Sequence, residues 1–208
     1  MSNRAFLSMM LAVFCAVLLW SAWLPYDLFT WGLEVFPALI GLALLTYTYK
    51  RFPFTRMLYV LMLIHAVILM VGGHYTYARV PAFEWLRHAF DLTRNHYDRL
   101  GHLAQGFIPA MVAREILIRL RVVRTRPWLF FIVTSICLAL SALYELLEWG
   151  VAVASGTAAE DFLGTQGDVW DTQTDMAMCL VGAILAQLTL TRIHDRKIAE
   201  IEKQEART

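Results

Sequence analysis

The sequence is poor in charged residues and has none of the motifs that mark common soluble enzymes. Only 17% of its 208 residues are Asp, Glu, Lys or Arg, whereas about a quarter is usual for a soluble domain. The chain has no Gly-rich phosphate loop, no CxxC pair and no Ser/His/Asp order of the kind found in nucleophilic hydrolases. A net charge of +1 gives no sign of a nucleic-acid partner. These absences argue against a soluble nucleotide-binding protein, a nucleophilic hydrolase and a nucleic-acid-binding protein.

Cysteine and flexible linkers are also scarce. The three cysteines, Cys15, Cys137 and Cys179, all lie inside apolar stretches, so they predict no disulfide framework and leave the redox compartment open. No internal repeat and no Gly/Ser-rich linker divides the chain. We therefore predict one membrane domain over residues 1–193, followed by a solvated, charged cytoplasmic tail over residues 194–208.

Long hydrophobic runs dominate what is present. Hydrophobic residues make up 59% of the chain, and the mean hydropathy is +0.54. Runs of about 20 apolar residues are long enough to cross the hydrocarbon core of a bilayer. Six segments fit, and the fourth fits least well because it contains His102, Arg114 and Glu115. The predicted spans are residues 5–23, 31–49, 55–72, 100–120, 127–150 and 172–193.

The first of these runs is expected to be a retained span, because it is longer than the apolar core of a signal peptide and lacks a small-residue cleavage site. Between the third and fourth spans, residues 81–92 place polar side chains at i, i+3, i+4 and i+7. This spacing predicts a short amphipathic helix, either lying in the outer interface or packed on the bundle. The predicted fold is an all-α, polytopic membrane helical bundle with six transmembrane helices and this interfacial helix.

The distribution of basic residues predicts the orientation. With the N-terminus in the cytoplasm, 13 of the 18 Lys and Arg residues fall on the cytoplasmic side, four fall on the other side, and Arg114 lies within a span. An excess of Lys and Arg in cytoplasmic loops is the rule for inner-membrane proteins. We predict a multi-pass protein of the bacterial inner membrane with both termini cytoplasmic and with membrane lipids as its surroundings. The sequence indicates no protein partner.

Polar residues gather at three helix ends that this topology places on the non-cytoplasmic side. They occupy residues 94–102, 144–149 and 164–175. Within them Asp98 and His102 are spaced i, i+4, as are Asp171 and Asp175, and such pairs share a helix face. Three helix ends can thus direct acids and imidazoles to one point, as in bundle metal sites. The predicted metal-ligating residues are Asp98, His102, Glu145, Glu148, Asp168, Asp171 and Asp175.

The charge of this group calls for compensation. Its six acids carry −6 if all are ionised, and Arg94 with Arg99 return +2. A residual −4 in a partly desolvated pocket requires protonation of the acids or a bound cation. Two interpretations stay open: a divalent metal site, with His96 or Glu145 as the candidate catalytic base, or a structural hydrogen-bond and ion-pair network of protonated acids.

Other polar residues in the spans carry weaker signals. His65 and His74 fit best as histidines bonded to backbone carbonyls, although both lie in the outer half and could join the acidic group. Glu34 and Asp27 are interpreted as markers of the outer boundary. Glu115 and Arg119 form an i, i+4 pair at the cytoplasmic end, which predicts a structural ion pair.

With these motifs in hand, the whole chain resembles the YjdF-type family of bacterial inner-membrane proteins. The match rests on RNHYDRLGH at 94–102, YELLEW at 144–149 and GTQGDVWDTQTDM at 164–176. The resemblance implies a location and a topology, and it implies no reaction.

More distantly, the chain resembles the VanZ-like membrane proteins. The positions that match their pattern are Asp98 with His102, then Glu145, then Asp168, Asp171 and Gly182. Glu148 and Asp175 depart from it, since that family often has Gln and Asn there. This resemblance points to the cell envelope and supplies no mechanism.

Three functions fit these observations. The first is a metal-dependent enzyme that acts on a lipid or lipid-linked substrate at the outer leaflet. The second is a structural or accessory envelope protein whose polar group only fixes the bundle. The third is an ion- or proton-coupled transporter, against which the acids gather at one face instead of the midplane.

Overall fold

The computed structural model describes residues 2–155 and 165–205, and within these ranges it contains seven helices and no strand. Residue 164, which opens the third polar segment, and residues 206–208 of the predicted tail lie outside the described residues. The helices are α1 (Asn3–Ala22), α2 (Leu28–Thr48), α3 (Arg56–Tyr75), α4 (Pro81–Ala89), α5 (Tyr97–Arg119), α6 (Arg126–Ser155) and α8 (Asp171–Glu205).

The predicted all-helical membrane architecture is confirmed in its coarse form. Five helices of the described chain, α1, α2, α3, α6 and α8, are long and apolar enough to cross a membrane. Helix α5 has 23 residues, which is sufficient length, but its charged side chains keep its hydropathy low. The number of spans therefore stays a prediction. The short amphipathic helix is found as α4, and its place at a membrane interface also stays a prediction.

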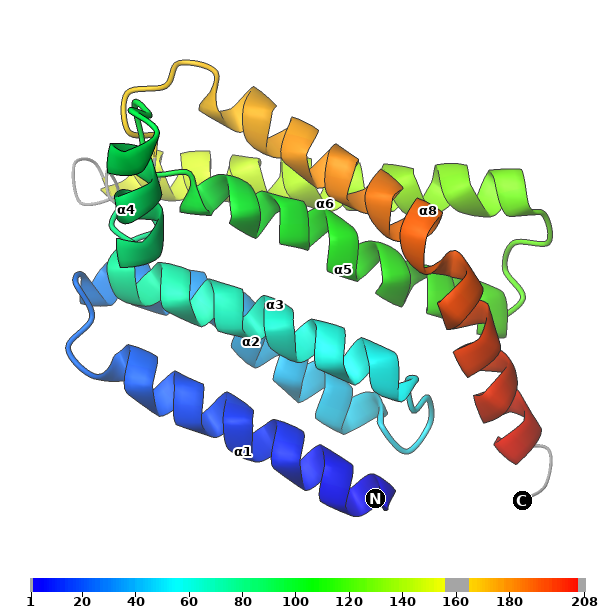
Figure 1. Cartoon of the computed structure of the whole chain (residues 1–208). Coiled ribbons are helices and arrows are strands. Elements are labelled where there is room, and N and C mark those ends of the chain that lie inside the picture. Colours follow the sequence, from blue (N-terminus) through cyan, green and yellow to red (C-terminus); the bar gives the residue numbers. More distant parts are fainter. Residues whose placement is uncertain (1, 156–164, 206–208) are drawn as a thin grey trace.

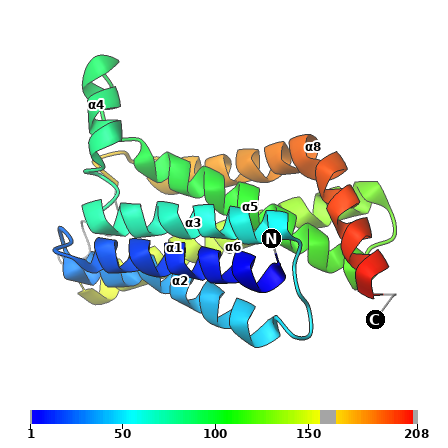
Figure 2. The same ribbon diagram turned by 60° about the horizontal axis from the view of Figure 1, so that its bottom comes forward.

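Six long helices run side by side with alternating direction, and α4 stands across one end of them (Figure 1). The loop that enters α8 lies at this same end, whereas the start of α1 and the last turns of α8 point to the other end. Turning the molecule shows α4 projecting from the bundle at the end away from the C-terminus (Figure 2). The start of α5 and the start of α8 are therefore neighbours in space.

Two glycines allow α5 and α8 to pack against each other by their backbones. A Cβ atom on Gly106 would lie 1.8 Å from the carbonyl oxygen of Cys179, and one on Gly182 would lie 2.1 Å from that of Leu103. Small residues allow this close approach in membrane helix pairs, where van der Waals packing drives association. The close contact fixes the spacing of the polar residues at the two ends of both helices.

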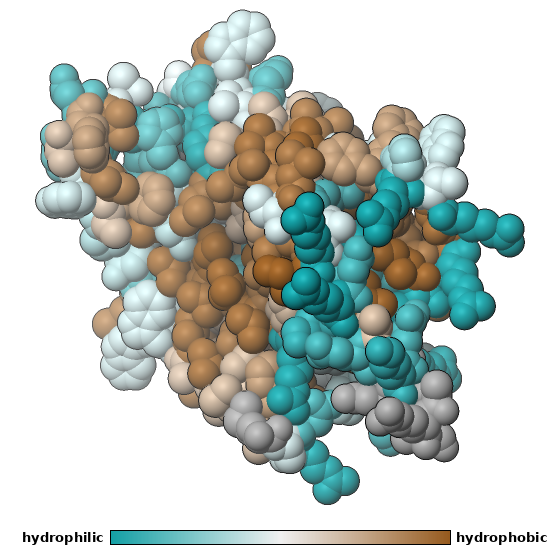
Figure 3. Space-filling view, turned by 45° about the vertical axis from the view of Figure 1, so that its right-hand side comes forward, coloured by the Kyte–Doolittle hydropathy of each residue, from teal (hydrophilic) through white to brown (hydrophobic). Residues whose placement is uncertain are grey.

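The flanks of the bundle are apolar. Figure 3 shows a broad hydrophobic area beside a group of hydrophilic side chains near the C-terminal end. Exposed apolar side chains such as Leu19 at 72%, Val153 at 69% and Leu188 at 69% belong to α1, α6 and α8. So large an exposed apolar surface is unfavourable in water, whereas lipid chains would cover it.

Helix α8 continues well beyond residue 193, and one residue of the predicted tail is buried. His194 has no exposed surface. Its Nε2 atom lies 2.9 Å from Oε2 of Glu115, and its Nδ1 atom lies 3.2 Å from Nη1 of Arg114. The expectation that His194 is solvated is wrong, because the sequence places it next to charged residues but α8 turns its face toward α5. The boundary of the tail itself stays a prediction.

We call this group the His194 cluster: Thr55, Arg114, Glu115, Arg119, His194 and Asp195. Glu115 has no exposed surface, and its carboxylate accepts hydrogen bonds from the backbone N–H of Thr55 at 3.0 Å and from the Thr55 hydroxyl at 2.8 Å. Arg119 lies 3.2 Å from Glu115, which confirms the predicted pair. The cluster joins α3, α5 and α8 at one end of the bundle.

Candidate functional site

A second polar group lies at the opposite ends of α5 and α8, where α6 also contributes. We call it the His102 cluster: Arg94, Asp98, Arg99, His102, Glu145, Asp168, Asp171 and Asp175. The Nε2 atom of His102 lies 3.5 Å from a carboxylate oxygen of Asp98, 3.7 Å from one of Glu145 and 3.9 Å from one of Asp175. Three helix ends thus bring an imidazole and three acids together around one point.

The other ring nitrogen of His102, Nδ1, has a partner that orients the imidazole. Nδ1 lies 3.0 Å from Oε1 of Gln105, one turn along α5. A carbonyl oxygen only accepts hydrogen bonds, so Nδ1 carries a proton, and Nε2 either presents a lone pair or, in the imidazolium form, is a second N–H donor. In both forms Nε2 faces the three carboxylate oxygens. A histidine ligand of a metal ion usually donates its second N–H to such an acceptor, which fixes its tautomer.

The distances around Nε2 are longer than usual hydrogen bonds and fit either ion pairs with a protonated imidazole or ligands around a shared ion. Protein N–H···O bonds measure about 2.7–3.2 Å, and each oxygen here is farther from Nε2 than that. Ligands about 2.0–2.2 Å from one tetrahedral ion lie about 3.4 Å from each other. Oε1 of Glu145 is buried without a hydrogen-bond partner in the described part of the chain.

One subset of this group meets a stricter geometric condition for holding a metal ion. Asp98, His102 and Asp175 each offer a ligand atom, and these atoms lie within 4.8 Å of one another. All three come from the predicted ligand set. Imidazole and carboxylate donors suit Zn²⁺ and Mn²⁺, and carboxylates alone suit Mg²⁺.

Two arginines engage Asp168 and Asp171, and they also contact two of the acids around His102. Arg94 forms an ion pair with Asp171 and lies 3.4 Å from both Asp168 and Asp98. Arg99 forms an ion pair with Asp175 and lies 2.9 Å from Asp168 and 3.1 Å from Asp171. Asp168 and Asp171 thus face guanidinium groups, although sequence spacing grouped them with the ligands.

Hydrogen bonds, burial and nearby charges change the pKa of Asp168, which lies before α8, and of His96, which lies before α5. The backbone N–H of Trp170 donates to Asp168 at 2.9 Å, and together with Arg99 and Arg94 it lowers the pKa of that carboxyl. Burial, followed by the charges of Arg94 and Arg99, lowers the pKa of His96. His96 precedes α5 and does not line the pocket described below. Its role as a base stays a prediction.

Amide contacts hold the loop before α8 against the start of α5. The backbone N–H of Asn95 donates to the Gln166 side chain at 2.9 Å, and Gln166 donates back to the Asn95 carbonyl at 3.0 Å. Gln166 and Gly167 both have positive φ angles, 49° and 84°. Sequence spacing gave no sign of this reciprocal pair, since its two residues are 71 positions apart.

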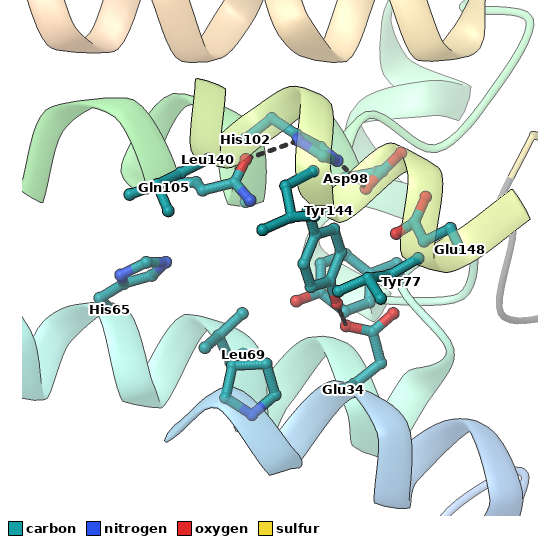
Figure 4. A pocket seen from close by; sticks show the side chains of 14 residues that line it. Glu34, His65, Leu69, Tyr77, Asp98, His102, Gln105, Leu140, Tyr144 and Glu148 are labelled. Carbon is teal, nitrogen blue, oxygen red and sulfur yellow. Dashed lines mark hydrogen bonds and ion pairs between the residues drawn. The ribbon is translucent and has the colours of Figure 1, made fainter. Parts of the chain in front are cut away.

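A pocket of about 260 Å³ adjoins the His102 cluster, lined in part by Glu34, His65, Tyr77, Tyr144 and Glu148 together with Asp98 and His102. In Figure 4, Asp98 and Glu148 lie at one end of the pocket, and His65 lies at the other. Glu148, a predicted ligand, thus faces the pocket and not the Nε2 atom of His102.

Sequence analysis missed the part that Glu34 plays. It is 5% exposed and accepts a hydrogen bond from the Tyr144 hydroxyl at 3.2 Å, so its interpretation as a boundary marker is wrong. Asp27 instead caps α2 by accepting from the backbone N–H of Thr30. His74 bonds the Ser21 carbonyl oxygen, as expected, whereas His65 faces the pocket with its Nε2 atom buried and without a partner in the described residues.

Comparison with known proteins agrees with a membrane assignment. A family model described as "Predicted membrane protein (DUF2238)" matches residues 6–196. The chain is 49% identical over 182 residues to a protein of Escherichia coli (strain K12) named "Inner membrane protein YjdF", covering 88% of this chain and 87% of that relative. No solved structure matches the chain.

Proposed function

The chain belongs to this family of predicted membrane proteins, and from that premise we propose that it is a multi-pass inner-membrane protein whose His102 cluster binds a divalent cation. Its E. coli relative carries the inner membrane in its name. The cation would serve an enzyme that acts on a lipid or lipid-linked envelope substrate.

We propose six spans, with α5 as the fourth. Helix α5 contacts α3, α6 and α8, which places it inside the bundle with its charged side chains toward protein (Figure 1). Arg114, Glu115 and His102 are all buried, which explains why hydropathy alone undervalues this helix. Both termini would face the cytoplasm, and α4 would lie at the periplasmic interface next to the His102 cluster.

One observation carries the cation site: Nε2 of His102 faces three carboxylate oxygens at 3.5–3.9 Å. This arrangement places like charges together in a buried place, which is unfavourable unless a cation or a proton lies between them. The separations leave room for a cation, because each is longer than an ordinary hydrogen bond.

The roles of the residues follow from their contacts. Asp98, His102, Glu145 and Asp175 would hold the cation, and Gln105 would orient His102. The cation would polarise a phosphoryl or acyl oxygen of the substrate and activate water. Glu145 is a candidate base through the carboxylate oxygen that would not hold the cation, and His96 is a second candidate. Arg94 and Arg99 would keep Asp168 and Asp171 ionised and in place.

The test is elemental analysis of the full chain, purified in neutral detergent without chelator. We expect a stoichiometric divalent metal in the wild-type protein and its loss in His102→Ala and Glu145→Gln. Gln105→Ala should weaken metal affinity by about 10–100-fold, as removal of an orienting partner usually does. His88→Ala, at an imidazole that is 70% exposed on α4, is the matched control and should retain metal. A wild-type protein free of metal would refute the site.

The ion pairs of Arg94 and Arg99 favour a second candidate, a structural protein whose polar group only joins α5 to α8. Under that function His102→Ala and Glu145→Gln lower thermal stability and change no metal content. The two functions are therefore separated by the same purified variants.

A further inference from the structure

The polar pocket continues into a second and larger hollow. A cavity of about 650 Å³ lies among α1, α2, α3 and α5, and it shares Pro37, His65 and Leu69 with the pocket beside His102. Because the same three residues line both, the two hollows adjoin at the level of His65. The molecule thus contains two neighbouring hollows with chemically different linings.

The larger end is apolar. Its lining includes Leu7, Phe14, Ala38, Leu42, Met62 and Val112. A volume of about 650 Å³ falls within the range of sites that enclose small ligands. Such a lining suits a flexible hydrocarbon chain and offers little to a polar molecule.

The smaller end is acidic. Glu34 and Glu148 are both buried and line it, and within residues 2–155 and 165–205 neither forms an ion pair with Arg or Lys. Tyr144 donates to Glu34 from the same wall. These carboxyl groups are outside the four residues assigned to the cation, and because burial disfavours the charged form of a carboxyl group, they would ionise only beside another positive charge. A positively charged group that donates hydrogen bonds would complement them.

One residue at the junction can receive a polar connection between these ends. The Nε2 atom of His65 is buried and has no partner among the described residues, and His65 lines both hollows. An occupant that is polar in its middle as well as at its head would fit here.

We propose that the two adjoining cavities open into one another beside His65 and bind one amphiphile, with its hydrocarbon chain in the apolar cavity and an ammonium-bearing head between Glu34 and Glu148. This inference rests on the proposed function, since it names the substrate class of that same site. The proposed site differs from ordinary lipid contact on the outside of a bundle, because the protein would select both the charge of the head and the length of the hydrocarbon chain.

The experiment measures the thermal midpoint of the full chain in neutral-detergent micelles with added single-chain probes. Dodecylamine should raise the midpoint, because a ligand that binds only the folded state stabilises it. Dodecanoate has the same chain with a negative head, and butylamine has the same head with a short chain; neither should stabilise. Octylamine should lie between butylamine and dodecylamine. Equal stabilisation by dodecanoate and dodecylamine would overturn the assignment of the head.

A variant in the apolar cavity tests the chain separately. Gly41 lines that cavity, and a Cβ atom there meets no atom within 4 Å. Gly41→Phe should fill the space and weaken dodecylamine binding by roughly tenfold or more, since displacing about two buried methylene groups costs that much. Gly32→Phe is the matched control: Gly32 lies on the same helix with equal open space, and it lines neither cavity. Undiminished binding in Gly41→Phe would refute the chain site.

Metal analysis of the same samples separates the two proposals. Gly41→Phe should retain metal while losing the amphiphile, because it leaves Asp98, His102, Glu145 and Asp175 untouched. Selective dodecylamine binding by a metal-free wild-type protein would refute the cation site and leave the amphiphile site standing. Metal binding without any preference for dodecylamine would refute the amphiphile site and leave the cation site standing. If Gly41→Phe does not fold, the chain-length series in wild-type protein still decides.

Discussion

The His102 cluster and the His194 cluster each place a histidine among carboxylates and arginines, at opposite ends of the same helices, α5 and α8. In the His194 cluster both ring nitrogens have a partner within 3.2 Å. Arg114 only donates hydrogen bonds, so Nδ1 of His194 accepts and its Nε2–H donates to Glu115. In the His102 cluster only Nδ1 has such a partner, and Nε2 faces oxygens at 3.5 Å or more.

The two clusters also differ in the space beside them. The His102 cluster adjoins a pocket of about 260 Å³, with three acids in its wall. Glu115 and His194 have no exposed surface and line neither of the two cavities. Similar residue types thus serve two purposes, and the distances between partners distinguish them. The His194 cluster is a closed network, in which both ring nitrogens are paired, and it stabilises the fold. The His102 cluster is an open network, in which Nε2 has no partner at such a distance among the described residues, and it leaves room for a ligand.

The largest effect should come from breaking the closed network. Glu115→Ala leaves His194, Arg119 and Thr55 without their buried acceptor, and it should destabilise the protein by about 3–5 kcal/mol. Thermal unfolding in micelles measures this. The folded fraction should still carry metal, because the His102 cluster is unchanged. Glu200→Ala, at an exposed pair with Lys197, is the control and should cost less than about 1 kcal/mol. Loss of metal together with stability would show that the two clusters are not independent.

An intermediate effect should follow from separating the two helices between the clusters. Gly106→Ala puts a methyl group against the Cys179 carbonyl oxygen, and overpacking of this kind costs about 1–3 kcal/mol. Because α5 and α8 both shift, metal content and thermal midpoint should fall together, unlike in Glu115→Ala. Gly150→Ala, which meets open space on α6, should be neutral or stabilising by up to about 1 kcal/mol. If Gly106→Ala matches Gly150→Ala, the close backbone contact does not hold the clusters in place.

The smallest effect should appear at the edge of the His102 cluster and should depend on pH. The pKa of Asp168 is lowered in the folded protein, so its carboxylate stabilises the fold above the unfolded value of about 3.9. That contribution is lost as pH falls through the folded pKa. Asp168→Asn should therefore lower the thermal midpoint slightly at neutral pH, and the difference from wild type should disappear in acid. Asp91→Asn, at an exposed residue on the α4 side, should show no such pH dependence, and a constant Asp168→Asn difference down to low pH would contradict the assignment.

Sequence reasoning worked where a signal is local. Long apolar runs predicted α1, α2, α3, α6 and the first part of α8 to within a few residues, because hydrocarbon thickness sets their length. The i, i+4 spacing of Asp98 and His102 predicted that they share a face, and they lie 3.5 Å apart.

It failed where partners are distant in the chain. Glu34 meets Tyr144 across 110 residues, and His194 meets Glu115 across 79. Neither partner is marked by spacing, since only the tertiary fold brings the side chains of α2 and α6 together and packs α8 on α5. The division of the acids between His102 and the two arginines depends on side-chain directions, which periodicity does not give.

Helix α8 has 35 residues, which at 1.5 Å per residue makes about 52 Å of helix. The hydrocarbon core of a bilayer is only about 30 Å thick, so about 20 Å of this helix exceeds it. The C-terminal part of α8 bends away from the direction of its first part (Figures 1 and 2). A molecule that binds this charged, bent part would contact the same helix that positions Asp171 and Asp175 at its start.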